Sequence, residues 1–484
     1  MMENVDYIKE MLKKDTNQAS DITYREKIVC RQRVEIIYNE SLTGSDKISD
    51  FIIRSLDKIN RYNKRQDLVS AICNNIDNFK YKKVYSYKDI CYYLNYGFTI
   101  ILIEGFKGAL VLETKRNLSR SVSTPQTENS LRGSMDAFVE DMQTNLGLIR
   151  RRIKDNNLWI KSNEIGKYTK TLVNIVYIKG ICKEEYVKNI DDRLKKIDID
   201  GIVSTGVIKN LIERENKSVF PTIISTERPD RVSQALLAGK IVIMIDTSPF
   251  ALIIPISIND LFLATEDAYS KGINISLTRI VRYFAFLVTL LTPAVYIALT
   301  TYNQEMLPNQ LLISFASQRS TVPFPAFFEA IIMMASFEIL RECDLRLPTF
   351  TTSALSIVGA LILGEAAVNA GIVSPIMIIV IAITAVAALL FTEPEIINGV
   401  RWYRLLFMIG ANFLGIFGVV IVFILFITRL ASLDSFGLPF LYPLSPMDTA
   451  GLKNSIIKFP TKDLNKRQKA LSRNRIKLKS EEEL

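Results

Sequence analysis

The sequence predicts a cytoplasmic α/β region of one or two domains, followed by an α-helical transmembrane domain with four to six membrane segments. Of its 484 residues, 49% are hydrophobic and 23% are charged. That balance is too apolar for an ordinary soluble protein and too charged for a bundle that lies wholly in lipid. Most Lys and Arg residues lie in the first 240 residues and the last 25, whereas long apolar runs appear only after about residue 278.

The composition also limits the chemistry that the chain performs. It contains no histidine, which removes the commonest general base and the usual zinc ligand, and its five cysteines form no CxxC pair. Neither GxSxG nor GxxxxGK[ST] occurs in it. We therefore expect no enzyme activity, no metal and no cofactor. The first 15 residues are charged and lack the apolar core of a signal peptide, so we expect the N-terminal domain to stay in the cytoplasm.

Two parts are expected before the membrane domain. Residues 1–65 are predicted to form a polar, partly helical segment, and residues 66–255 a cytoplasmic α/β domain with one or two subdomains. In the latter, Ile- and Val-rich runs such as FTIILIEG and IVIMID alternate with charged helical patterns, which is typical of buried strands covered by helices. We interpret the cluster RRRIK at 150–154 as the basic, solvated end of a helix rather than a nucleic-acid or lipid patch, because no aromatic platform accompanies it.

The pentapeptide TERPD contains Glu227, Arg228, Pro229 and Asp230. A proline within a charged stretch between a strand and a helix indicates a rigid loop. Arg228 is well placed there to pair with an acid of a neighbouring element or subunit, because a guanidinium binds carboxylates in a bidentate manner. We expect this loop to support assembly.

The membrane domain is predicted between residues 278 and 430. Four apolar runs, 280–299, 353–370, 373–391 and 405–427, approach the ~20 residues that a ~30 Å bilayer core needs, and the stretch 323–348 is a fifth candidate. Basic residues flank these runs on the side that the positive-inside rule assigns to the cytoplasm. The last run contains Gly410, Gly415 and Gly418, so we expect it to be broken or re-entrant, although too short for two full spans. Residues 431–484 then form a cytoplasmic segment with a basic tail.

The stretch 323–348 carries two acids within an apolar run. Glu329 and Glu338 are nine residues apart, which places them on opposite sides of a helix, so at least one faces something other than lipid. Glu338 has Arg341 one turn further on, at the spacing of an intrahelical pair. Glu329 has no such neighbour, so we expect it to meet another helix, another subunit or water. The alternative is an interfacial helix whose acids reach water.

The same stretch carries a family resemblance. PFPAFFEAIIMMASFEILRECDLRLP, followed by SIVGALILGEAAVNAGIVSP, closely resembles the membrane part of the A subunit of GerA-type spore germinant receptors. Upstream, LRGSMDAFVEDMQTNLGLIRRRIK, KKIDIDGI, FPTIISTERPD and AGKIVIMIDTSPFALIIP look like that family's cytoplasmic domain in the same order, and SFGLPFLYPLSP is similar to its C-terminal signature. The resemblance covers about residues 85–460, and its motifs are long and irregular.

This resemblance implies a multi-pass subunit of a nutrient receptor in the inner membrane of the bacterial spore. It implies a transporter-like B subunit that binds the nutrient, a lipoprotein C subunit, further copies of the chain itself and membrane lipid as partners, without nucleic acid. The A subunits of the family are thought to form an oligomeric ion channel. Where that family usually has Gln and Glu in the third membrane stretch, this chain has Glu365 and Asn369, so the carboxylate lies one turn away.

A helical wheel divides the third stretch into two faces. One face is expected to pack on a neighbouring helix, because small residues at this spacing let backbones approach closely. It contains Ser356, Ala360, Gly364 and Ala367. The opposite face suits a pore, with an apolar constriction followed by a cation-attracting ring. It contains Val358, Ile362, Glu365 and Asn369. The alternative is that Glu365 and Asn369 bond to another helix and never meet an ion.

Three other functions are alternatives to a receptor channel. A secondary transporter would also place acids and broken helices in the membrane, but no inverted repeat is visible between the two halves of this domain. A non-conducting scaffold subunit is a second alternative. In a membrane-tethered enzyme, Asp198 and Asp200 of KIDIDGI would be metal ligands or an acid/base pair; solvated acids at a turn are the preferred interpretation, because no partner His or nucleotide loop exists.

Overall fold

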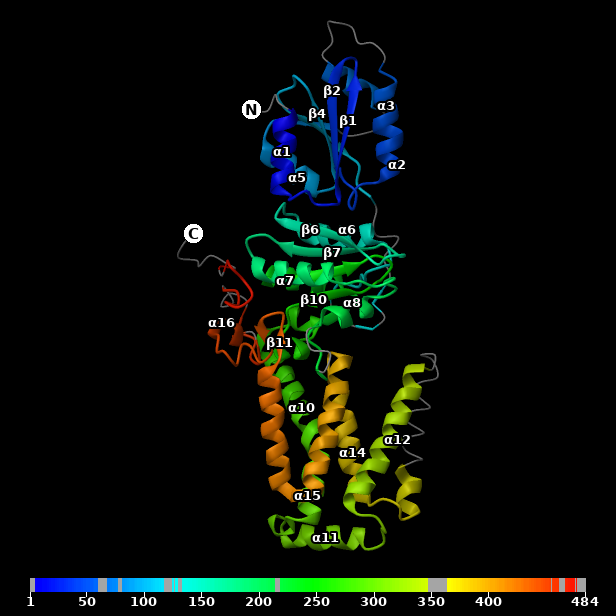
Figure 1. Cartoon of the computed structure of the whole chain (residues 1–484), viewed down its shortest axis with the longest axis vertical. Helices are drawn as coiled ribbons and strands as arrows, with labels where there is room; N and C mark the ends of the chain where they lie inside the picture. The colour runs from blue at the N-terminus through cyan, green and yellow to red at the C-terminus, as the bar shows by residue number, and fades with distance from the viewer. Residues whose placement is uncertain are drawn as a thin grey trace.

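Two five-stranded antiparallel sheets follow each other along the long axis of the molecule, and a helical bundle continues from the second (Figure 1). The structure is a computed structural model. It describes residues 5–59, 68–76, 81–116, 124–125, 127–128, 133–213, 218–346, 364–453, 455–460, 466–474 and 476. We call the end of the bundle that adjoins the second sheet the near end, and the opposite end, where helix α11 lies crosswise, the far end (Figure 1).

The first sheet has the strand order β1-β2-β4-β5-β3. Its strands are β1 (Ile22–Val29), β2 (Gln32–Asn39), β3 (Tyr81–Val84), β4 (Phe98–Ile103) and β5 (Ala109–Glu113). Alternate residues of β4 point to opposite faces, so Ile100 and Ile101 belong to two different hydrophobic cores. One core is closed by α1 (Val5–Asp15) and α5 (Tyr87–Asn95). The other is closed by the π-helical turn η1 (Ile48–Ile53), α3 (Arg54–Asp57) and α4 (Leu68–Asn75), and the short helix α2 (Ser45–Lys47) leads into η1.

The prediction for residues 1–65 needs correction. This segment is partly helical, but it also supplies β1 and β2, which pair with each other, and β2 pairs with β4 of the region expected to begin at residue 66. A boundary at residue 65 would therefore cut through one sheet. The reason lies in β1, an edge strand whose central residues Arg25 and Glu26 are exposed, so its apolar alternation is hidden in the sequence.

The second sheet has the order β6-β7-β9-β10-β8, and all its described pairs are antiparallel. Its strands are β6 (Leu158–Ile165), β7 (Thr171–Ile178), β8 (Ile224–Thr226), β9 (Ile241–Ile245) and β10 (Ala251–Ile254). Helices α7 (Glu184–Lys195) and α8 (Thr205–Ile212) cover one face. Helices α6 (Met142–Arg152) and α9 (Pro229–Ala238) cover the other, which shares its core with the helical bundle.

A buried ion pair joins the two sheet units. Arg150 Nη2 donates to Asp21 Oδ1 at 2.8 Å, and both residues are at most 2% exposed. Trp159 Nε1 donates to the Asp15 carbonyl at 2.9 Å beside this pair. The structure therefore corrects our interpretation of RRRIK: its first residue is neither solvated nor part of a ligand patch, because its charge is neutralised by an acid 129 residues away in sequence.

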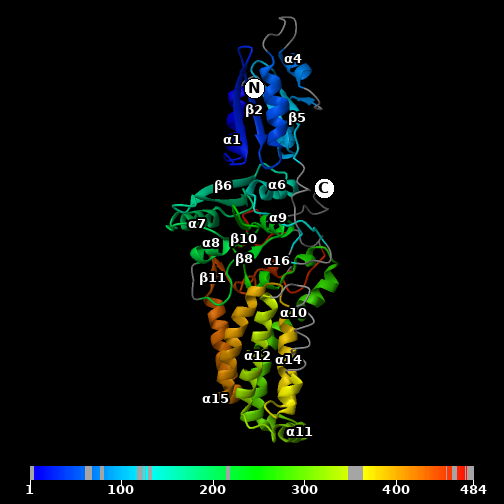
Figure 2. The ribbon, with the colours of Figure 1, turned by 90° about the vertical axis from the view of Figure 1, so that its right-hand side faces the viewer.

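The helical part begins with two short 3-10 turns. It contains η3 (Ile258–Phe262), η4 (Thr265–Ala268), α10 (Gly272–Thr301), η5 (Gln304–Met306), α11 (Asn309–Arg319), α12 (Ala326–Arg346), helical residues 364–369, α14 (Pro375–Ala388) and α15 (Pro394–Ser432). The chain then forms the hairpin β11 (Asp434–Ser435) and β12 (Leu438–Pro439) and the short helix α16 (Thr449–Leu452) beneath the second sheet (Figure 2).

Helix α15 is a helical hairpin. Its 39 residues reverse direction at Gly415, whose φ of 59° and ψ of −142° are not helical. The two arms pack so closely that a β-carbon on Gly418 would lie 2.0 Å from the Gly410 carbonyl oxygen. Asn303 Oδ1 accepts a hydrogen bond from the Ile416 amide at 3.0 Å and so satisfies a free N–H at the start of the second arm.

The expectation of a broken last run is thus confirmed, but its length was underestimated. The helix begins at Pro394, well before the apolar run, so the arms 394–414 and 416–432 reach about 30 and 25 Å at 1.5 Å per residue. Both run along the bundle (Figure 1). By length and composition α10 and α15 are candidates to cross a membrane, while α14 is a shorter apolar helix. Most of the predicted run 353–370 lies outside the described residues.

Aromatic side chains dock the bundle on the second sheet. Phe220, in the loop before β8, stacks on Tyr403 with ring centroids 5.8 Å apart and lies 6.0 Å from Phe426. Gly399 leaves room for this ring, since a β-carbon there would lie 2.8 Å from it. Both arms of α15 therefore meet the sheet at one buried point.

Candidate functional site

Glu329 lies at the far end of the bundle, in the first turn of α12, and is fully buried. Its Oε2 accepts hydrogen bonds from the backbone N–H and the hydroxyl of Ser374, at 2.9 and 2.8 Å. Ser374 is the N-cap of α14, so the carboxylate faces the positive end of that helix dipole. Arg319, which ends α11, brings its Nε to 3.5 Å from Glu329 Oε1. The expected meeting with another helix is therefore observed, and the carboxylate does not reach water within this chain.

The Glu329 site retains unused hydrogen-bonding capacity. In the described part of the chain, Glu329 Oε1, Arg319 Nε and the Tyr296 hydroxyl are buried and make no hydrogen bond. An ion pair at 3.5 Å compensates part of the burial of both charges. Among the described residues, Ser374 and Arg319 are thus the partners that hold the Glu329 carboxylate.

Glu338 lies in a different environment nine residues further along α12. Arg401 Nη2 lies 2.9 Å from its carboxylate, Arg404 Nη2 3.4 Å and Arg341 Nη2 3.5 Å. The predicted pair with Arg341 is observed, and two arginines from the first arm of α15 join it. The Glu338 side chain is 28% exposed. We call these four residues the arginine cluster.

The third predicted stretch is described only from residue 364 onwards. Val358, Ile362, Ser356 and Ala360 lie outside the described residues. Gly364 is buried, with its missing β-carbon 3.8 Å from Ile378 of α14, and Ala367 packs against the same core.

The remaining two polar residues of this stretch lie on its outer side. Glu365 and Asn369 are exposed, and no ion pair with another described residue involves Glu365. Among the described residues of this stretch, Gly364 and Ala367 pack inward, whereas Glu365 and Asn369 point outward. Whether the polar side lines a pore stays a prediction.

The TERPD loop binds its own chain. Arg228 is fully buried, and its Nε and Nη2 donate to Asp230 at 3.1 and 2.9 Å. Its guanidinium also donates to the carbonyls of Glu128 and Ser134, at 3.0 and 2.9 Å. Glu227 Oε1 accepts from the amide of Thr127 at 2.5 Å. The loop therefore fixes the segment before α6, and its expected role in assembly stays a prediction.

Pro229 and Asp230 complete the loop. Pro229 occupies the first turn of α9, where its missing N–H has no helical partner to lose. Asp230 also accepts from the Tyr269 hydroxyl at 2.7 Å, just before α10 begins. The loop is therefore linked to the entry of the helical bundle.

The junction between sheet and bundle carries charged contacts that the sequence analysis missed. Arg231 of α9 pairs with Glu393, the N-cap of α15, and its Nη1 lies 3.1 Å from Glu128 Oε2. Lys209 of α8 pairs with Glu395 in the first turn of the same helix. Burial raises the pKa of the Glu393 carboxyl, while Arg231 stays charged and opposes that shift. The acids at the start of α15 were a sequence signal for an N-terminus, but not for their partners.

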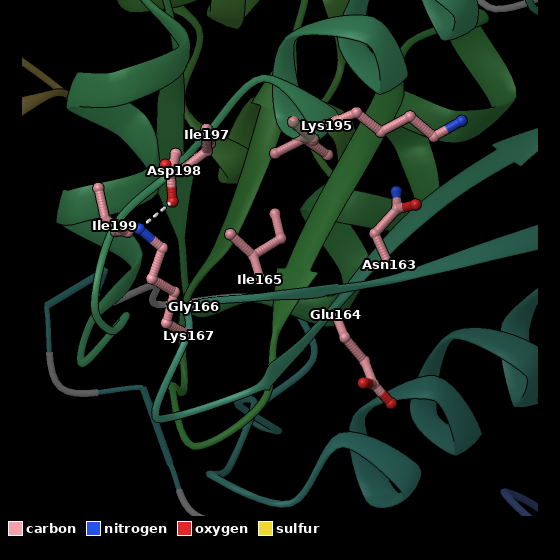
Figure 3. A pocket seen from close by; sticks show the side chains of 10 residues that line it. Asn163, Glu164, Ile165, Gly166, Lys167, Lys195, Ile197, Asp198 and Ile199 are labelled. Carbon is pink, nitrogen blue, oxygen red and sulfur yellow. Dashed lines mark ion pairs between the residues drawn. The ribbon is translucent and has the colours of Figure 1, made fainter.

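A polar pocket of 290 Å³ lies on the second sheet between the end of β6 and the end of α7 (Figure 3). Lys167 Nζ pairs with Asp198 at 2.8 Å across it, and both side chains are largely exposed. Asp200 is not among the lining residues. Among the described residues, no group of three or more His, Cys, Asp or Glu could hold a metal ion. The pair fits the interpretation of solvated acids at a turn.

Known proteins resemble this chain over nearly its whole length. The family profile described as Bacillus/Clostridium GerA spore germination protein matches residues 9–470. Spore germination protein KA of Bacillus subtilis (strain 168) is 38% identical over 466 residues, which cover 95% of this chain and 85% of that protein. Spore germination protein GerLA of Bacillus cereus is 33% identical over 474 residues, with 97% and 96% covered.

Similarity also extends to a solved structure. It is the crystal structure of the N-terminal domain of the A subunit of the Bacillus megaterium spore germinant receptor GerK3. The match has 32% sequence identity and a TM-score of 0.41, and covers 52% of this chain and 95% of that one.

Proposed function

The chain belongs to the Bacillus/Clostridium GerA spore germination protein family, and we propose that it is a non-enzymatic membrane subunit of a nutrient-sensing germinant receptor. The family assignment confirms the resemblance drawn from the sequence motifs. Its relatives are named spore germination proteins, and this role is the one we transfer to the chain. A nutrient bound by a partner subunit would be the signal that this subunit converts into ion release.

The arrangement of the bundle supports a multi-pass subunit with its soluble parts on the cytoplasmic side of the spore's inner membrane. Both sheets and the described C-terminal residues lie beyond the near end of the bundle (Figure 1). The α15 hairpin returns the chain to that side. Arg279 and Arg282 lie in the first turns of α10, also near that end, in agreement with the positive-inside rule.

Oligomeric ion conduction is the finer part of the proposal. The observation that carries it is the outward position of Glu365 and Asn369, whereas Gly364 on another side of the helix is packed. A carboxylate that faces lipid costs several kcal/mol, so this surface requires water or a second subunit. Repeated around a ring of copies, Glu365 would attract cations to a water-filled path.

Partner subunits would cover other parts of the bundle. The second arm of α15 exposes large apolar side chains, among them Phe417, Ile424 and Leu425. Such a surface suits lipid or apolar helices. We therefore propose contacts with a transporter-like B subunit and a lipoprotein C subunit, as well as with copies of the chain itself.

Flux through proteoliposomes tests the conducting role. Receptor complexes with the native chain should release cations passively, Glu365→Lys should abolish the flux, and Glu365→Gln should reduce it. Glu305→Gln, an exposed acid in η5, is the matched control and should leave the flux unchanged. Flux that Glu365→Lys does not alter would reject the pore surface. Coupled uptake would instead indicate a transporter, and assembly without flux a scaffold.

A further inference from the structure

A cavity of 460 Å³ lies where the second sheet unit meets the bundle. Its walls come from α9, the turns η3 and η4, the start of α10 and the C-terminal tail. Figure 2 shows the helix α16 and the start of α10 on this same side of the molecule. Segments that are about 230 residues apart, such as Leu237 and Arg467, therefore form one concave surface. We call it the basic cavity.

Positive side chains dominate its lining. The basic residues are Arg231, Lys240, Arg279, Lys458, Lys466 and Arg467, whereas the acids among the lining residues are Asp260 and Asp267. Such an excess of cations in a concave site attracts negatively charged ligands, because the low-dielectric walls focus the positive potential. A cavity of this volume also falls in the range that holds small ligands.

Some of these cations already have carboxylate partners. Lys240 Nζ lies 2.6 Å from Asp260, and Arg279 Nε lies 2.9 Å from Asp267. Arg231 is engaged by Glu128 and Glu393, as described above. These pairs join neighbouring elements of the cavity wall.

The tail supplies the positive charge that remains. Arg467 Nε donates to the Leu237 carbonyl at 2.8 Å, and its Nη1 to the Ile476 carbonyl at 2.6 Å. Neither Arg467 nor Lys466 forms an ion pair with a described residue, and burial lowers the pKa of the Arg467 guanidinium. Carbonyl groups orient this guanidinium without neutralising it. An anion in the cavity would therefore interact with an uncompensated positive charge.

The level of the cavity points to the source of that anion. Arg279 lies in the second turn of α10, and Gly272, which begins the helix, packs against the tail carbonyl of Lys458. At the same level, another side of α10 exposes Ile273, Leu277 and Phe284. If α10 crosses the membrane as proposed above, its apolar surface lies in the hydrocarbon core. The basic cavity beside it then lies at the level of the lipid headgroups.

We propose that the basic cavity binds the phosphate group of an anionic phospholipid from the cytoplasmic leaflet. Guanidinium and ammonium groups converge there, and they are the side chains that bind phosphate best in proteins. The lipid would join the C-terminal tail to the start of α10. A phosphate ester free in solution offers the same chemistry, so the experiment separates the two sources.

The test uses the full chain purified in detergent and reconstituted in phosphatidylcholine nanodiscs with or without phosphatidylglycerol. Native mass spectrometry measures the phosphatidylglycerol retained, and thermal unfolding in detergent with inorganic phosphate measures binding of the free anion. The charge-removal variant is Lys466→Gln with Arg467→Gln, and Lys466→Glu is a second variant that keeps the carbonyl contacts of Arg467. Lys469→Gln, in the same tail but outside the lining, is the matched control.

The native chain and the control should retain phosphatidylglycerol, and both cavity variants should bind it about tenfold more weakly. Stabilisation by inorganic phosphate without lipid retention, lost in the same variants, would assign the cavity to a soluble phosphate instead of a lipid. Equal lipid retention and equal phosphate response in native and variant chains would overturn the proposal. The phosphate measurement in detergent does not require ion conduction, so it is independent of the channel test.

Discussion

The far end of the bundle and the arginine cluster handle buried charge in opposite ways, although both involve acids of α12. At the far end, Glu329 is fully buried and relies on one N-cap serine and one arginine. In the arginine cluster, Glu338 is partly exposed and has three guanidinium partners on two helices. Two acids nine residues apart thus differ in the number of groups that can replace a lost partner.

This difference indicates that the number of available partners determines how strongly a charged residue affects the free energy of unfolding. The mere presence of a charge in an apolar helix does not. A buried charge whose single partner is removed stays uncompensated, and this costs several kcal/mol. A charge with several partners and access to water redistributes its contacts and loses about 1 kcal/mol or less.

The largest effect is expected at Glu329. Glu329→Lys places a second cation beside Arg319 and at the positive end of α14, so it should lower the free energy of unfolding by about 3–5 kcal/mol. Glu329→Leu should be milder, at about 1–3 kcal/mol, because it adds no second cation. It leaves the Ser374 donors without an acceptor and Arg319, which is 21% exposed, without its carboxylate. Thermal unfolding of the purified chain in detergent measures both.

Glu305→Lys is the control for this comparison, since Glu305 is an exposed acid at the same end of the bundle. It should change the unfolding midpoint little. If Glu329→Lys and Glu329→Leu were equally mild, Glu329 would be solvated in the native protein and the contrast with Glu338 would disappear.

Arg228 tests whether the effect of a buried charge on stability depends on its location in the bundle or on the small number of its partners. It lies outside the bundle, yet it is as buried as Glu329, and it is the guanidinium that pairs with Asp230 and binds the carbonyls of Glu128 and Ser134. The Tyr269 hydroxyl and the Arg231 amide also donate to Asp230, but they carry no compensating charge there. Arg228→Ala should therefore cost about 3 kcal/mol, because the buried Asp230 carboxylate loses its paired cation and keeps two neutral donors. It should also lower the abundance of the receptor complex in spores.

Arg231→Ala is the informative comparison, since Arg231 shares its site with two acids, Glu128 and Glu393. A normal unfolding midpoint and normal abundance for Arg228→Ala would show that the loop contributes neither stability nor assembly.

Much of the fold could be predicted because local patterns specify it. The buried strands β4 and β9 are short runs of Ile, Leu and Val that do not depend on distant residues to be recognised. The edge strand β1 was missed, since its exposed charges conceal the alternation. The hairpin at Gly415 was predicted only as a break, because glycines indicate where a helix is interrupted but not which direction it takes afterwards.

The site was less predictable for a physical reason. Intrahelical pairs such as Glu338–Arg341 follow from helical spacing, and this one was found. Partners across helices, such as Ser374 for Glu329 or Asp21 for Arg150, are set by packing between segments far apart in sequence. The charge of a residue indicates that a partner is needed, but it contains no information on which segment will provide it.

Gly415 extends the comparison to the backbone at the far end. Its φ of 59° and ψ of −142° are disfavoured for residues with a β-carbon, and such a carbon would lie 2.4 Å from Asn303 Oδ1. Gly415→Ala should therefore destabilise the chain by about 1–3 kcal/mol. Gly206→Ala in α8, where the nearest atom is 3.8 Å away, should be neutral or stabilising by up to about 1 kcal/mol. An equal response of the two variants would mean that the hairpin turn is not formed in the native protein.

The smallest effect is expected at Glu338, and its dependence on salt sharpens the contrast. Glu338→Gln keeps a side-chain oxygen that can accept from Arg404, while Arg341 and Arg401 are more than one third exposed and can turn to water. The loss should be about 1 kcal/mol or less at low salt, and it should shrink as ionic strength rises, because exposed pairs are screened. Glu329→Gln should show a larger loss that salt barely changes, since ions do not reach a fully buried carboxylate. Unfolding of both variants at low and high salt measures the difference. If Glu338→Gln were the more damaging of the two, or if both losses responded to salt alike, the two acids would occupy equivalent surroundings and exclusivity of partners would not explain their roles.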